Sequence, residues 1–146
     1  MNFGRLVAAA IVGLVVEVCY GFLVYGMLLS GEFGKYPALY RSAESGPGYL
    51  PLMFGGLFIA ILAAAMMFAK GYEGGSGAAE GVRFGVLLGL FAVFAFAGVN
   101  YGVLNIGRRL ALYTAFASFV EWTLIGTAIG LVYKPAAIPA RRGAGV

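Results

Sequence analysis

Two glutamates stand inside long apolar stretches, and they are the residues of this sequence best placed to do chemistry. Glu17 lies near the middle of the run 6–29, and Glu121 lies near the middle of the run 110–133. A charged side chain at mid-membrane costs about 2.5–3.5 kcal/mol on insertion scales. Neither run carries a lysine, arginine or histidine at that depth. Burial therefore favours the uncharged carboxyl, which donates as well as accepts hydrogen bonds.

A buried carboxyl needs hydrogen-bond partners, and several polar or aromatic side chains are candidates. Tyr20 follows Glu17 by three positions, Trp122 is adjacent to Glu121, and Asn100 lies toward the end of a third apolar run. The remaining candidates are Tyr113, Thr114, Ser118 and Thr123. Three interpretations stay open: hydrogen bonds that tie helices together, a proton-coupled site for a cation or small amphiphile, or contact with a lipid, pigment or another subunit.

The composition excludes several classes of protein. Hydrophobic residues make up 62% of the 146 residues and charged residues 11%, against about 45–50% and 25% in soluble domains. There is no histidine, and Cys19 is the single cysteine, so we expect no internal disulfide, no metal site and no cofactor. No stripe of basic residues indicates nucleic-acid binding. No nucleophile accompanies the glutamates, so we expect no catalytic residues and no enzyme.

The elements that position the glutamates are membrane-spanning helices. A span needs about 20 mostly apolar residues. The stretches that satisfy this length are 6–29, 50–69, 81–103 and 110–133. The sequence therefore predicts an all-α, four-transmembrane-helix bundle over residues 1–133, followed by a basic Pro/Gly tail, residues 134–146.

The basic residues of the loops predict the orientation. One side would carry Arg5, Lys70, Arg83, Lys134, Arg141 and Arg142, and the other Lys35, Arg41, Arg108 and Arg109. Because basic residues concentrate on the cytoplasmic side, this excess predicts that both termini lie together in the cytoplasm.

Small residues recur every fourth position, which is typical of helices that pack closely in membranes. The glycines at this spacing are Gly13 and Gly21, which flank Glu17, then Gly81, Gly85 and Gly89, and finally Gly126 and Gly130. We predict that these faces form helix contacts, either within the bundle or with another subunit.

Three segments resemble a known group of proteins. "KGYEG", "EGVRFGVLLGLF" and "GLVYKP" are similar to segments of small, uncharacterised four-helix integral membrane proteins of bacteria. The resemblance implies the four-span fold, and it implies no activity. We expect the chain to lie in a bacterial inner membrane. The chain also resembles small multidrug transporters in having four short spans with a glutamate in the first, although Glu121 and the long first loop depart from their pattern.

These features lead to one main functional hypothesis. We expect a non-catalytic accessory or structural subunit of a larger bacterial membrane complex of respiratory or photosynthetic type. Its partners would be membrane lipids and other membrane subunits or further copies of itself. The alternatives are a small proton-coupled transporter of a cation or amphiphile that uses Glu17, and a lipid- or quinone-binding membrane sensor.

Overall fold

The structure, a computed structural model, is all-helical over the residues that it describes, 2–41 and 44–133. Within this part of the chain, four helical runs are long and apolar enough to cross a membrane: Phe3–Leu28, Gly46–Gly71, Gly77–Val103 and Arg108–Val132. The predicted all-helical class and the four apolar helices are thus confirmed. The predicted tail, 134–146, lies outside the described residues.

Two of the four runs contain a π-helical segment. The first is α1 (Phe3–Gly21) continued by the π-helical η1 (Phe22–Leu28), and the third is α4 (Gly77–Ala92), π-helical η4 (Val93–Gly98) and α5 (Val99–Val103). The other elements are α2 (Ser30–Phe33), η2 (Pro37–Leu39), η3 (Gly46–Tyr49), α3 (Leu50–Gly71) and α6 (Arg108–Val132).

Local sequence explains where several helices begin. Asn2 precedes α1, and its side chain accepts a hydrogen bond from the backbone N–H of Arg5 at 3.2 Å. Ser76 caps α4 in the same way through the N–H of Ala79. Pro51 occupies the first turn of α3, where a missing backbone N–H costs nothing.

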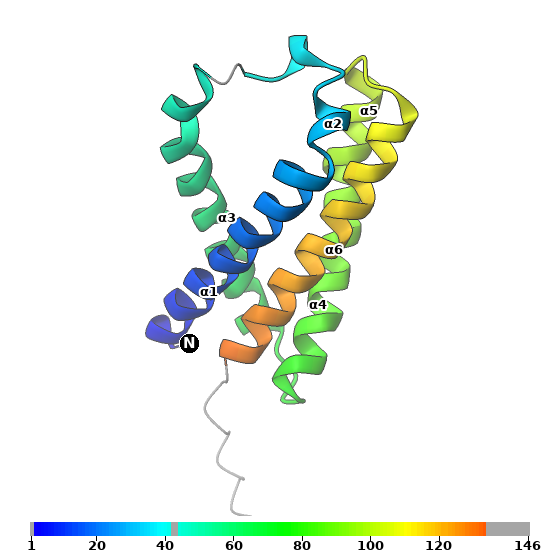
Figure 1. Cartoon of the computed structure of the whole chain (residues 1–146). Coiled ribbons are helices and arrows are strands. Elements are labelled where there is room, and N and C mark those ends of the chain that lie inside the picture. Colours follow the sequence, from blue (N-terminus) through cyan, green and yellow to red (C-terminus); the bar gives the residue numbers. More distant parts are fainter. Residues whose placement is uncertain (1, 42–43, 134–146) are drawn as a thin grey trace, which may run out of the picture.

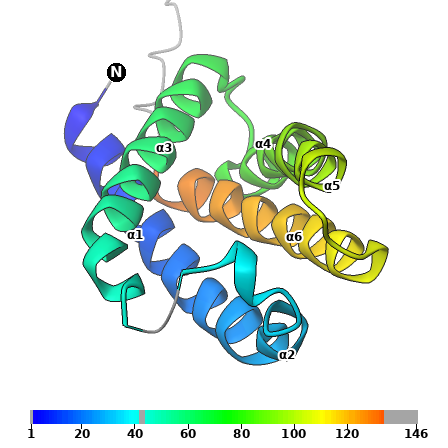
Figure 2. The ribbon, with the colours of Figure 1, turned by 90° about the horizontal axis from the view of Figure 1, so that it is seen from above.

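Helix α6 lies between the other long helices (Figures 1 and 2). It packs against α4 on one side and against α1 on the other, and α3 packs mainly against α1. We call the end where α1 begins and α6 ends the base, and the opposite end, which carries α2 and α5, the top (Figure 1). The connection from α3 to α4 lies at the base.

The contact between α4 and α6 is made of glycines. A Cβ added at Gly81 would lie 2.7 Å from the carbonyl oxygen of Gly126, and one at Gly85 would lie 2.6 Å from that of Thr123. Gly130 faces back toward the backbone of Gly81. The two backbones therefore approach at a distance that only glycine allows, which is how membrane helices gain dispersion contacts without a hydrophobic effect.

The other predicted packing glycines divide into two groups. Gly89 meets α6, since an added Cβ would lie 2.7 Å from the carbonyl oxygen of Phe119, and Gly13 meets α3 at 2.7 Å from the side chain of Ile61. Gly21, in contrast, has only the Tyr25 ring of its own span within 4 Å. The small-residue face of α1 thus contacts other helices as far as Gly13, in the middle of the helix, and no longer does so at Gly21, where α1 ends.

The buried core sits toward the base. Leu6 of α1, Ile61 of α3, and Ile125 and Ile129 of α6 are almost completely buried there, together with Tyr133. Every buried residue of α3 lies at or after Ile61. The first half of α3 consequently adds no fully buried residue to the core, although Phe58 is partly buried against it, and its beginning leans away from α1 in Figure 1.

Replacing Gly85 tests the glycine contact. Because its Cβ would meet backbone atoms, we expect Gly85→Ala to lower the free energy of unfolding by about 1–3 kcal/mol, as overpacking does. The measurement is SDS-induced unfolding of the purified protein in detergent. Gly102→Ala is the matched control, since an added Cβ there meets nothing within 4 Å. Equal, small effects of both substitutions would contradict the described packing.

Candidate functional site

The two mid-span glutamates lie together between α1 and α6. Glu121 of α6 is 7% exposed, and Glu17 of α1 is half-buried beside it, close enough for the two carboxyls to interact directly. The ion pairs in the described part of the chain all involve Glu32, so no basic side chain neutralises either carboxyl there. The site is therefore a carboxyl pair that must satisfy itself with uncharged partners.

Tyrosines of the first span supply those partners. The hydroxyl of Tyr25 donates a hydrogen bond to Oε2 of Glu121 at 3.0 Å, and it lies 3.4 Å from the hydroxyl of Ser118. The hydroxyl of Tyr20 donates to the backbone carbonyl of Ala117 at 2.9 Å. Both bonds join the first span to α6, so this polar cluster ties the two helices together within the apolar layer.

Tyr25 was missed by the sequence analysis for a geometrical reason. In a regular α-helix, residues 20 and 25 point about 140° apart, since each residue turns the helix by about 100°. The π-helical turns of η1 bring residues five apart onto the same side. The rings of Tyr20 and Tyr25 consequently contact edge to face, with centroids 6.2 Å apart, and both hydroxyls reach α6.

One atom of the site remains unsatisfied. Oε1 of Glu121 is buried and has no hydrogen-bond partner. A buried polar atom without a partner costs free energy, and such atoms occur at positions that exchange protons or bind small ligands. The carboxyl of Glu17 is the neighbouring titratable group and so is the nearest candidate to share a proton with it.

The other predicted site residues lie elsewhere. Asn100 is exposed in α5, and Trp122 packs on the core from the side of α6 next to α3 and α4. The hydroxyls of Thr114 and Thr123 donate to backbone carbonyls of their own helix, at 2.9 Å and 2.7 Å. The polar site is therefore Glu17, Glu121 and the tyrosines.

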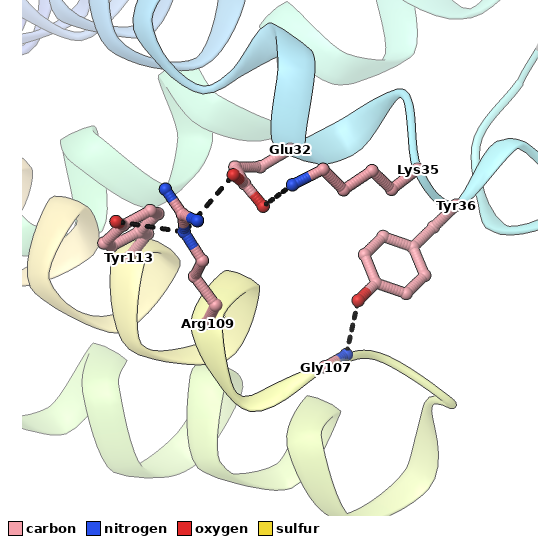
Figure 3. Close-up of polar contacts among 6 residues, drawn as sticks. All are labelled: Glu32, Lys35, Tyr36, Gly107, Arg109 and Tyr113. Atoms are coloured by element: carbon pink, nitrogen blue, oxygen red, sulfur yellow. Dashed lines mark hydrogen bonds and ion pairs between the residues drawn. The ribbon is translucent and has the colours of Figure 1, made fainter.

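A second polar cluster holds the first loop onto the start of α6 (Figure 3). Glu32 of α2 accepts from Lys35 at 2.8 Å and pairs with Nε of Arg109 at 3.3 Å. The pKa of Glu32 lies below its usual range because Lys35 donates a hydrogen bond to the carboxylate and Arg109 adds positive charge. The stabilisation from the ion pairs of Glu32 is therefore fully present above the ordinary glutamate pKa of about 4.3. It is lost as the pH falls through the lowered pKa of Glu32.

Two further hydrogen bonds complete this clamp. The backbone N–H of Gly107 donates to the hydroxyl of Tyr36 at 2.8 Å, and Nε of Arg109 donates to the hydroxyl of Tyr113 at 3.1 Å (Figure 3). The loop between the first two spans is thus fastened over the top of α6. We interpret the clamp as a structural lid.

Neither cluster has the composition of a metal site. Between residues 2 and 133, with 42–43 set aside, no three His, Cys, Asp or Glu side chains gather where one ion would contact them all. The carboxyl pair supplies acidic oxygens and a tyrosine hydroxyl. Its available chemistry is proton sharing and hydrogen bonding.

Comparison with models of protein families, with curated proteins and with solved structures finds no match for this chain. The resemblance to small four-helix bacterial membrane proteins therefore remains a prediction from the quoted segments. The function is argued below from the residues and their geometry.

The bond between Tyr25 and Glu121 can be tested by a double-mutant cycle. Bonds between membrane helices contribute about 0.6 kcal/mol on average and up to about 1.7 kcal/mol. We expect Tyr25→Phe to lower the free energy of unfolding in detergent by an amount in this range. In a Glu121→Ala background the same substitution should cost less, because only the longer contact with the hydroxyl of Ser118 remains. An unchanged cost in that background would show that Tyr25 stabilises the protein by other contacts.

Proposed function

We propose that this chain is a non-catalytic integral membrane protein that serves as an accessory or structural subunit of a larger membrane complex. The proposal includes the bacterial inner membrane, a host of respiratory or photosynthetic type, and termini in the cytoplasm, as the basic residues of the loops favour. The observation that carries it is the uncovered first half of α3.

This half of α3 has few neighbours within the chain, Phe58 being partly buried against the core. Among residues 50–60 none is buried, and Leu52 and Ile59 are 76% and 66% exposed. Gly55 and Gly56 are adjacent, and a Cβ added at either would meet nothing within 4 Å. The helix therefore presents a smooth, glycine-containing surface at the top of the bundle.

The upper part of the first span, η1, is also exposed. No residue of η1 is buried, and Phe22 and Leu28 are 68% and 76% exposed. In lipid, helices associate where small residues let backbones approach, and large side chains pack around that contact. The glycines of α3, together with the exposed side chains of η1 at the same end of the bundle, fit a transmembrane helix of another subunit.

Affinity purification tests this association. We expect the protein, extracted from its native membrane in mild detergent, to co-purify with larger membrane subunits identified by mass spectrometry. Gly55→Phe and Gly56→Phe, tested singly, should reduce the recovery of those subunits about tenfold. An overpacked contact costs about 1–3 kcal/mol, and about 1.4 kcal/mol corresponds to tenfold in affinity.

The control is Gly102→Phe, which adds the same ring at a glycine of α5 that also faces open space. It should leave recovery unchanged. Isolation of a lone monomer or homodimer, without larger subunits, would rule the proposal out. A loss of recovery that is equal for all three variants would show that α3 is not the contact.

A second candidate function is proton-coupled transport of a cation or small amphiphile, in which Glu17 carries the proton. The unpartnered Oε1 of Glu121 beside Glu17 favours it, because a carboxyl pair with an unsatisfied oxygen has room for one more proton. In this function the half-buried Glu17 exchanges the proton and Glu121 receives it.

Reconstitution in liposomes separates the two functions. If the transport hypothesis holds, Glu17→Gln abolishes pH-driven uptake of a fluorescent cationic amphiphile, because glutamine cannot release a proton. Glu32→Gln, which alters a carboxyl of the lid instead, should leave uptake intact. Uptake by the wild-type protein that is no faster than in empty liposomes would remove this candidate.

A further inference from the structure

A groove runs between α3 and α4 along the lower half of the bundle. Near the base it holds a hollow of about 400 Å³, whose lining includes Glu73 and Arg83. Deeper in the apolar layer it holds a second hollow of about 180 Å³, whose lining includes Ala60 and Trp122. Met67 lines both hollows, so they lie next to each other, and we treat them as two parts of one groove.

The groove follows from the way in which the helices pair. α3 packs on α1 and α4 packs on α6, so consecutive helices are joined at the base without packing along their length. Phe68 of α3 and Phe84 of α4 meet edge to face, with ring centroids 5.5 Å apart, and line the space between the two helices near the base. The walls above them are apolar.

The length of the groove matches one leaflet of a bilayer. From Ala60 to Gly71 the wall formed by α3 spans about 16 Å, at a rise of 1.5 Å per residue. Half of a hydrocarbon core about 30 Å thick is roughly 15 Å. The deep end lies at Trp122, near the middle of α6, and the mouth lies at the base, where headgroups would be.

The mouth carries both signs of charge. Arg83 is exposed there and has no ion pair among residues that the structure describes. Glu80 is already engaged, because its carboxylate accepts the backbone N–H groups of Glu73 at 2.9 Å and Gly75 at 2.5 Å. The side chain of Glu73 is exposed on the same rim.

We propose that this groove binds one acyl chain of a zwitterionic aminophospholipid, of the phosphatidylethanolamine class. Arg83 would take the phosphate, as guanidinium groups do with paired hydrogen bonds. Glu73 would accept the ammonium group. Two carboxylates on the rim oppose a headgroup with net negative charge, which separates this site from a general attraction to anionic lipid.

Trp122 is the single tryptophan of the chain, so it reports directly on the deep end of the groove. Brominated acyl chains quench tryptophan fluorescence on contact. The protein is reconstituted in mixed phosphatidylethanolamine and phosphatidylglycerol bilayers, with bromine on the chains of one lipid at a time. We expect about a fivefold preference for quenching by the brominated aminophospholipid, because only its headgroup offers Glu73 an ammonium group and one charge near a membrane surface is worth about this much.

Three variants make the test specific. Glu73→Gln should abolish the preference, because only the aminophospholipid carries the ammonium group that this carboxylate accepts. Ala60→Phe should reduce quenching by both lipids because it fills the deep end. Lys70→Gln, which removes a basic residue of the last turn of α3 that does not line the groove, should change neither.

Two results would contradict binding of an aminophospholipid in the groove. Equal quenching by the two lipids, or a preference for the anionic one, would overturn the proposal. Quenching that is absent in wild-type protein would show that another protein segment covers the groove. This site lies on the lower half of α3, so its failure leaves the association through Gly55 and Gly56 untouched.

Discussion

The hydrogen bond between Tyr25 and Glu121 crosses from η1 to α6 in a layer where water cannot take its place. An unpaired polar group costs several kcal/mol in hydrocarbon, so the carboxyls of Glu17 and Glu121 constrain which helices can be neighbours. The π-helical turns of η1 bring Tyr25 onto the same side as Tyr20. The polar tie thereby sets how the first span lies against α6.

Helix α6 uses opposite sides for two kinds of contact. Toward α4 it presents Gly126 and Gly130 in a close backbone approach, and toward α1 it presents Glu121. Since α3 packs mainly on α1, its first half stands clear of the bundle and its second half leaves a groove beside α4. The association surface and the lipid groove are both consequences of this pairing.

Hydropathy predicted the four helices, and the positions of Glu17 and Glu121 predicted a polar site between the first and last of them. Tyr25 was not predicted because its position depends on a π-helical segment, and no residue pattern in η1 signals that change of register. The divergence of α3 was equally hidden, since an apolar residue that faces lipid looks the same in sequence as one that faces another helix. Gly21 matched the packing spacing but meets only its own span.

The most direct measurement is solid-state NMR of the protein in bilayers, with ¹³C in tyrosine ring carbons and glutamate carboxyls. The account predicts a correlation between the Cζ of Tyr25 and the carboxyl carbon of Glu121, and a second one between the carboxyls of Glu17 and Glu121. The first correlation is assigned by its loss in Tyr25→Phe, and the second by its loss in Glu17→Gln. Spectra without a tyrosine–glutamate correlation, or with one that persists in Tyr25→Phe, would contradict the tie between α1 and α6.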